Sequence, residues 1–171
     1  HAAFAEVLGR AGAELVVHGH QHENLTEEIA GVAGPMPVLG IVSGTYGAGI
    51  ALHVLVRTQH GELNVVNTHL DPAAAGTFRK QELIGIMSHM RQRIAGETPL
   101  IFGGDLNARP NTDDIQAVSF GLTDAFASCG VEAGETFPAH APDRRIDYLF
   151  LRQARCTDAR VINTRASDHR P

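Results

Sequence analysis

The sequence has few cysteines, no excess of positive charge and no long apolar run, and each absence excludes a class of protein. Its two cysteines, Cys129 and Cys156, fit no CxxC or zinc-knuckle spacing. Its 14 basic residues are outnumbered by 19 acidic ones, and the net charge of -5 argues against gripping nucleic acid by a general basic surface. No apolar run approaches the roughly 20 residues of a membrane span, so we expect a soluble protein, cytoplasmic or secreted.

The cysteines and the chain ends leave the compartment open. Two unlinked cysteines are the simpler expectation, and a single disulfide is the alternative. The chain begins at His1 rather than at Met, and it stops at Pro171 directly after a polar motif. We therefore expect both ends to be cut, and a targeting segment could precede residue 1.

Hydrophobic patterning predicts strands that alternate with helices, and therefore a layered α/β fold. Turn-rich sequence at 31–37 and 59–62 separates some of these elements. The predicted strands lie at 14–17, 38–42, 51–56, 63–68, 99–104, 145–151 and 159–162, and the predicted helices at 2–8, 77–94 and 114–120.

Four polar clusters follow or interrupt predicted strands, where side chains of several strands can converge on one rim of a sheet. Taken singly, each has an ordinary structural explanation. Asp105 could be a turn former or helix cap, and Asp168 with His169 could be a surface pair. Asp147 interrupts an apolar strand, where an unpaired carboxylate is unfavourable, and an ion pair with a neighbouring arginine would explain it. The clusters are Asn67–Leu70, Gly103–Asn107, Arg145–Tyr148 and Ser167–His169.

Together the clusters supply hard oxygen ligands and two histidines, His69 and His169, but no thiolate. Carboxylate and amide oxygens suit Mg²⁺, Mn²⁺ or Ca²⁺. An Asp–His pair can hold an imidazole against a scissile phosphate or activate water. Because a metal ion and histidine together are suited to phosphoester hydrolysis, the clusters predict a metal-dependent phosphoesterase site.

In order and spacing, four segments resemble motifs of the endonuclease/exonuclease/phosphatase superfamily. The resemblance covers roughly residues 50–171 and implies a four-layer α/β sandwich of the deoxyribonuclease type, of which this stretch would be the C-terminal half. The segments are NTHLD at 67–71, GGDLNARP at 103–110, RRIDYLFL at 144–151 and SDHRP at 167–171.

The resemblance implies a role for the polar residues of the first three motifs. His69 would contact the phosphate or support the site. Asp105 would bind metal or activate the nucleophile, and Asn107 would orient the substrate phosphate. Asp147 would be a supporting carboxylate.

The fourth motif would supply the catalytic pair, Asp168 and His169, with His169 at the scissile phosphate. Arg79 and Gln81 match the helix that follows the first motif in the superfamily, without an assigned role. The metal, Mg²⁺ or Mn²⁺, would be held by Asp105, Asn107 and Asp168.

Residues 1–49 lack the early Asn and the metal-binding Glu that the first half of the superfamily contributes. They resemble instead the C-terminal part of a calcineurin-like metallophosphoesterase, whose GHxH motif appears as Gly19–His22. In that family the histidines serve a dinuclear metal centre, so His20 and His22 are candidate ligands for a second metal. A histidine-rich surface loop without metal is the alternative. We therefore expect two parts, residues 1–49 and residues 50–171.

The predicted function is that of a divalent-metal-dependent phosphoester hydrolase, either a phosphodiesterase or nuclease, or a phosphatase. The alternatives are a dinuclear calcineurin-like enzyme using His20 and His22, and an inactive truncated or fused fragment. A rearranged or misassembled fragment is the expected origin, ahead of a natural fusion or a divergent first half of the nuclease-type fold. The substrate could be a nucleic acid, a small phosphate ester or a lipid headgroup, because the fold does not choose among them.

Overall fold

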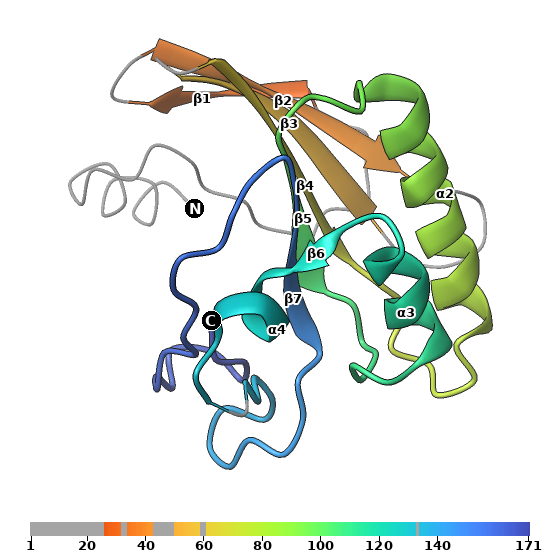
Figure 1. Cartoon of the computed structure of the whole chain (residues 1–171), viewed down its shortest axis with the longest axis vertical. Coiled ribbons are helices and arrows are strands. Elements are labelled where there is room, and N and C mark those ends of the chain that lie inside the picture. Colours follow the sequence, from red (N-terminus) through yellow and green to blue (C-terminus); the bar gives the residue numbers. More distant parts are fainter. Residues whose placement is uncertain (1–25, 32–33, 43–49, 59–60, 133) are drawn as a thin grey trace.

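A seven-stranded sheet of order β1-β2-β3-β4-β5-β7-β6 organises the chain (Figure 1). The computed structural model describes residues 26–31, 34–42, 50–58, 61–132 and 134–171, with the side chains of 51–56, 61–132 and 134–171. Strands β4 and β5 run parallel, and the other neighbouring pairs run antiparallel. The strands are β1 (Thr26–Gly31), β2 (Gly34–Val42), β3 (Ile50–Thr58), β4 (Gly61–His69), β5 (Leu100–Asp105), β6 (Thr123–Asp124) and β7 (Asp147–Arg152).

Three helices accompany the sheet in the described part of the chain. Parallel strands require a crossover connection, and α2 (Thr77–Arg93) provides it between β4 and β5. Helix α3 (Asp113–Ser119) lies beside α2 on one side of the sheet, and the short α4 (Ala125–Cys129) lies next to β7 (Figure 1). None of these helices is long and apolar enough to cross a membrane. The predicted α/β class is confirmed.

The core lies between the sheet and α2. Leu83, Ile86 and Met90 are buried at the i, i+3, i+7 spacing of one helix face, and they pack with the wholly buried strand residues Leu100 and Phe102. Full burial of one such side chain stabilises the fold by about 1.5–3 kcal/mol. This cluster fixes the helix against the strands whose ends carry the polar motifs.

The apolar spacing of the helix predicted at 77–94 indicates one buried stripe that includes Phe78 and Ile84, and for these two residues the prediction is wrong. Phe78 and Ile84 are 42% and 58% exposed, whereas Ile86 is buried. Successive helical residues are about 100° apart, so Ile84 points well away from the face that Leu83 presents to the sheet. Both side chains therefore remain at the surface.

Most predicted elements between residues 50 and 152 agree with the structure to within a few residues, and one later prediction is wrong. Residues 159–162 form no strand, and Ala159 makes only an isolated bridge with Gly130. In the region predicted to be turn-rich, residues 34–37 belong to β2, which pairs with the unpredicted edge strand β1. Edge strands tolerate charge, so the acidic β1 sequence TEEIAG lacks a strong strand signal.

The two cysteines are also paired differently from the simpler expectation. Cys129 and Cys156 are joined by a disulfide, with their Cα atoms 6.0 Å apart. The bridge between Gly130 and Ala159 brings the two segments together, a contact that their separation of 27 residues does not reveal.

The first part of the chain is described only in part. The helix predicted at 2–8, the strand at 14–17 and the histidines His20 and His22 lie outside the described residues. Strands β1 and β2 belong to the same sheet as β3, and β2 pairs with β3 from Leu39 to Val42. The sheet thus includes strands from both sides of residue 49, and the division there stays a prediction.

Candidate active site

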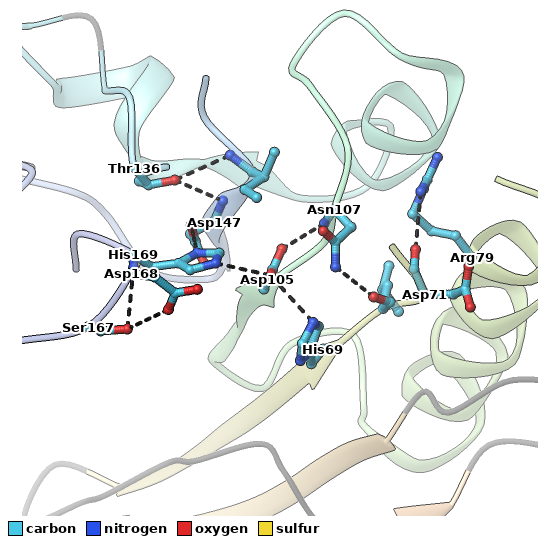
Figure 2. A network of polar contacts seen from close by, with 12 residues as sticks. His69, Asp71, Arg79, Asp105, Asn107, Thr136, Asp147, Ser167, Asp168 and His169 are labelled. Atoms are coloured by element: carbon cyan, nitrogen blue, oxygen red, sulfur yellow. Dashed lines mark hydrogen bonds and ion pairs between the residues drawn. The ribbon is translucent and has the colours of Figure 1, made fainter. Parts of the chain in front are cut away.

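Three neighbouring strands place polar side chains in one row at one edge of the sheet. In the strand register, His69 at the end of β4 pairs with Asp105 at the end of β5, and Asp105 pairs with Asp147 at the start of β7. Because β7 runs antiparallel to β5, its first residue lies at the edge where the other two strands end. The fourth predicted residue, His169, reaches this row from the C-terminal segment (Figure 2).

Asp105 lies at the centre of the row. Its Oδ2 atom is 3.4 Å from His69 Nε2 and 3.8 Å from His169 Nε2, and its side chain is only 15% exposed. Its Oδ1 atom accepts a hydrogen bond from the backbone N–H of Asn107 at 2.8 Å. Burial raises the pKa of Asp105 and the charge of Asp147 raises it further, against the lowering by the Asn107 hydrogen bond and the two imidazoles.

His169 is oriented by Asp147. Its Nδ1 atom lies 2.9 Å from Asp147 Oδ2, which leaves Nε2 on the side of Asp105. The ring of Phe137 packs against the imidazole at 4.6 Å between ring centres. Burial by itself lowers the pKa of His169, but the hydrogen bond and charge of Asp147, with the charges of Asp105 and Asp168, outweigh it and raise the pKa. The structure therefore favours the protonated imidazole.

Asp168 does not form the expected pair with His169. Its exposed carboxylate accepts a hydrogen bond from Ser167 Oγ at 3.1 Å, and its carbonyl oxygen accepts one from the Ala139 N–H at 2.7 Å. Residues 166–169 form a bend in which the Asp168 carboxylate contacts Ser167, so the carboxylate nearest in sequence is not the one bonded to the ring. Asp147, predicted as a supporting carboxylate, is the residue bonded to the imidazole.

Asn107 connects the ends of β4 and β5. Its Nδ2 atom donates a hydrogen bond to the Leu70 carbonyl at 2.8 Å, and its backbone φ of 47° is one that asparagine tolerates better than most residues. Gly104, with φ of 120°, lies so close to β4 that an added Cβ would collide with the Thr68 carbonyl oxygen. The Gly-Asp-Leu-Asn sequence therefore has backbone requirements as well as polar side chains.

The model of the endonuclease/exonuclease/phosphatase family matches residues 15–169. The chain belongs to this family. The match includes residues 15–49, which the sequence alone relates to calcineurin-like enzymes, and the α/β fold of the deoxyribonuclease type is confirmed. A comparison with curated proteins finds no significant match.

Several solved structures resemble the chain, which spans about half of their length. A conserved protein of unknown function from Enterococcus faecalis is 25% identical with a TM-score of 0.58, over 71% of this chain and 53% of that one. A family member from Bacteroides thetaiotaomicron is 21% identical, with a TM-score of 0.58 and coverage of 75% and 55%. A mannosyl-6-phosphatase from the same organism is 20% identical, with a TM-score of 0.54 and coverage of 80% and 55%.

The metal that members of this family use would find a suitable donor set in the row. Asp105, Asp147 and His169 each offer a ligand atom, and these atoms lie within 4.8 Å of one another. Two carboxylates and one imidazole suit a hard divalent cation such as Mg²⁺ or Mn²⁺. The cluster shares Asp105 with the ligand set expected from the sequence, and metal binding by Asn107 and Asp168 stays a prediction.

The arginines that flank Asp147 do not pair with it. Arg145 donates to both oxygens of Asp124, at 3.1 and 2.6 Å, and this pair is nearly buried. Arg144 lies 3.5 Å from Asp143. The structural ion pair that offered an ordinary explanation for Asp147 is therefore absent among the described residues, and His169 is its partner instead.

The sequence predicts no role for three residues that support the row of polar side chains. The hydroxyl of buried Thr136 accepts hydrogen bonds from the N–H groups of Ile146 and Asp147, at 3.3 and 3.4 Å. Arg79 donates to the Asp71 carbonyl at 3.1 Å, as Figure 2 shows, and Glu82 accepts from the Asp71 N–H at 2.8 Å. The sequence resemblance points to Arg79 and Gln81 in this helix, whereas in the structure Gln81 is exposed and the neighbouring Glu82 is buried.

Proposed function

We propose that this chain carries the histidine and carboxylate part of the active site of a phosphoester hydrolase that depends on a divalent metal ion. One observation carries the proposal. The nearly buried Asp105 carboxylate has two imidazoles beside its Oδ2 atom, His69 and the Asp147-bound His169. Membership of the family supports the reaction class, and the activity of this half-length chain is part of the proposal.

His169 is proposed to meet the negative charge that develops on the phosphate. The hydrogen bond from Nδ1 to Asp147 fixes the ring and leaves the Nε2–H free to donate to a phosphoryl oxygen. Because the surrounding carboxylates raise the pKa of His169, the ring keeps this proton to a higher pH than an ordinary histidine does. A preorganised cationic donor stabilises the transition state without reorganising during the reaction.

Asp105 is proposed to accept the proton of the attacking water. Burial raises its pKa, which makes the ionised carboxylate a stronger base than an exposed aspartate. His69, 3.4 Å from the same carboxylate and half exposed, can bind a phosphate oxygen from the solvent side. The Asn107 amide has one N–H on Leu70, so its second N–H is available to orient the substrate.

The carboxylates of Asp105 and Asp147 are proposed to hold the divalent ion, Mg²⁺ or Mn²⁺, while the protonated His169 is left to the phosphate. When bound, the ion would neutralise phosphate charge and stabilise the leaving oxygen. The overall charge of -5 makes such local compensation useful for an anionic substrate.

Hydrolysis of bis(p-nitrophenyl) phosphate, a diester, and p-nitrophenyl phosphate, a monoester, tests the proposal with Mg²⁺ or Mn²⁺ present. His169→Gln and Asp105→Asn should each lower kcat by roughly 10²–10⁴-fold. Asp158→Asn, an exposed substitution away from the row, should leave kcat unchanged. Full activity in either site variant, or no hydrolysis by the complete chain with either metal, would overturn the proposal.

A further inference from the structure

A second pair of histidines lies on the face of the sheet that α2 covers, apart from the catalytic row. His53 on β3 and His89 on α2 are 36 residues apart in sequence, and their ring nitrogens Nδ1 and Nε2 are 3.2 Å apart. In the strand register His53 pairs with Val66, three residues before His69 on β4. At about 3.3 Å per residue, the pair is displaced by roughly 10 Å along the sheet from the end of β4.

Asn64 fixes the proton of the first histidine. His53 Nε2 lies 2.8 Å from the Asn64 Oδ1 atom, and Asn64 is only 6% exposed. An amide oxygen can only accept, so His53 donates from Nε2 and, when neutral, presents a bare Nδ1 lone pair to His89. Metal-binding histidines are held in the same way, with one ring N–H donated to a protein oxygen while the other nitrogen binds the ion.

The separation of the two facing nitrogens suits a shared ion. Zinc–imidazole bonds are about 2.0–2.1 Å long, so two nitrogens at a tetrahedral angle around one ion are about 3.3 Å apart. The observed 3.2 Å is close to this value and lies at the long end of ordinary hydrogen-bond distances. The rings already stand edge to face, with 79° between their planes.

We propose that His53 and His89 bind a transition-metal dication of the Zn²⁺, Ni²⁺ or Cu²⁺ type, which ties α2 to β3. Imidazole suits these ions and not Mg²⁺, so this site and the oxygen-rich Asp105 site select different metals. On binding, the His89 proton shifts from Nε2 to Nδ1, and both facing lone pairs go to the ion. Water completes the coordination, so the site is weaker than a structural zinc site with four protein ligands.

The charges around the pair keep His89 in the neutral form that a metal ion needs. Burial, the neighbouring His53 and the positive charge of Arg93 all lower the pKa of His89, which keeps its imidazole available to an ion at neutral pH. Arg93 lies in the last turn of α2 and is exposed, so it repels a bound cation without supporting the core. Replacing it should tighten the site.

Zinc titration by calorimetry, in excess Mg²⁺, tests the proposal. The complete chain carries His20→Gln and His22→Gln in every sample, so that the GHxH motif does not contribute. In this background the chain should bind one more equivalent of Zn²⁺ than its His89→Gln variant. With Arg93→Gln added to the background in place of His89→Gln, the dissociation constant of that zinc equivalent should fall several-fold. His140→Gln removes an exposed histidine and should leave both the stoichiometry and the dissociation constant unchanged.

Thermal unfolding gives a second readout that does not depend on hydrolysis. An ion that binds only the folded chain raises Tm, so Zn²⁺ should raise the Tm of the background chain and not that of the His89→Gln variant. Since His89 is partly exposed at the helix surface, its variant is expected to fold, and its own melting curve without zinc checks this. Equal zinc stoichiometry and equal Tm shifts with and without His89 would overturn the proposal.

Discussion

The sheet carries two groups of histidines whose surroundings have opposite electrostatic effects. His169 faces the carboxylates of Asp147 and Asp105, and its pKa is raised against the effect of burial. His89 faces another histidine and Arg93, and its pKa is lowered by burial and by both neighbours. The same side chain is thus shifted toward its cationic form in one place and toward its neutral form in the other, which is what the two proposed roles require.

The opposite pKa shifts of His169 and His89 arise from the strand ends and helix face that surround each ring. The end of β5 and the start of β7 bring two carboxylates, Asp105 and Asp147, to one edge of the sheet, where the His169 imidazole meets negative charge. On the face covered by α2, the charged or titratable groups that lower the pKa of His89 among the described residues are His53 and Arg93. The neighbours supplied by the fold, rather than the histidine itself, decide the chemistry.

The largest expected effect comes from removing the Asp147 carboxylate, which gives His169 the electrostatic surroundings that His89 lacks. Asp147→Asn takes away the negative charge that raises the pKa of His169 and replaces the acceptor for its Nδ1–H. We expect kcat for phosphoester hydrolysis to fall by roughly 10²–10⁴-fold. Asp168→Asn should lower it by less than about tenfold, because that exposed carboxylate contacts Ser167 rather than the ring and its loss alters only a more distant charge. A greater loss in Asp168→Asn than in Asp147→Asn would contradict the assignment.

The sequence predicts which residues form the polar row at the sheet edge better than it predicts how they pair. His69 and Asp105 are visible because each ends an apolar strand, and the carboxyl ends of parallel strands meet at one edge. Asp147 is visible as a lone carboxylate in an apolar strand. The partner of His169 is not visible, since Asp168 is adjacent in sequence while Asp147 is 22 residues away. Pairing depends on side-chain direction, which only the assembled strands define.

Isolated polar residues are harder still to predict. Thr136 stands in no motif, and its role follows from one buried hydroxyl beside two N–H groups. His53 and His89 belong to a strand and a helix whose packing no local pattern specifies. By contrast, strands β3, β4 and β5 and helix α2 follow from hydrophobic periodicity, because burial of an apolar face dominates their folding.

A smaller effect is expected at Thr136, which supports the catalytic row without facing it. Thr136→Val keeps the side-chain shape but leaves the Ile146 and Asp147 N–H groups without their hydroxyl acceptor. Leaving a buried donor unsatisfied should lower the free energy of unfolding by about 1–3 kcal/mol. Displacement of Asp147 should lower kcat more than it changes KM. Thr136→Ser restores the acceptor and should recover most of kcat; failure of serine to do so, with normal folding by circular dichroism, would assign Thr136 to packing alone.

The smallest effect concerns how the two histidine groups respond to pH, and it compares them directly. A lowered folded pKa means that His89 binds fewer protons in the folded chain than in the unfolded one, so stability falls as the pH drops below the ordinary value of 6.5 toward the folded pKa. The raised pKa of His169 has the opposite sign: its contribution is complete below 6.5 and is lost as the pH rises through the folded pKa.

Chemical denaturation across this range, without added metal, measures both contributions. His89→Gln should flatten the loss of stability on the acidic side, because the variant has no proton to take up on unfolding. His169→Gln should remove a loss on the alkaline side instead. Both groups are partly exposed, so solvent screening keeps the two changes small. Identical pH dependence in the two variants would show that the neighbours of each imidazole do not distinguish them, and the electrostatic contrast between the two groups would fail.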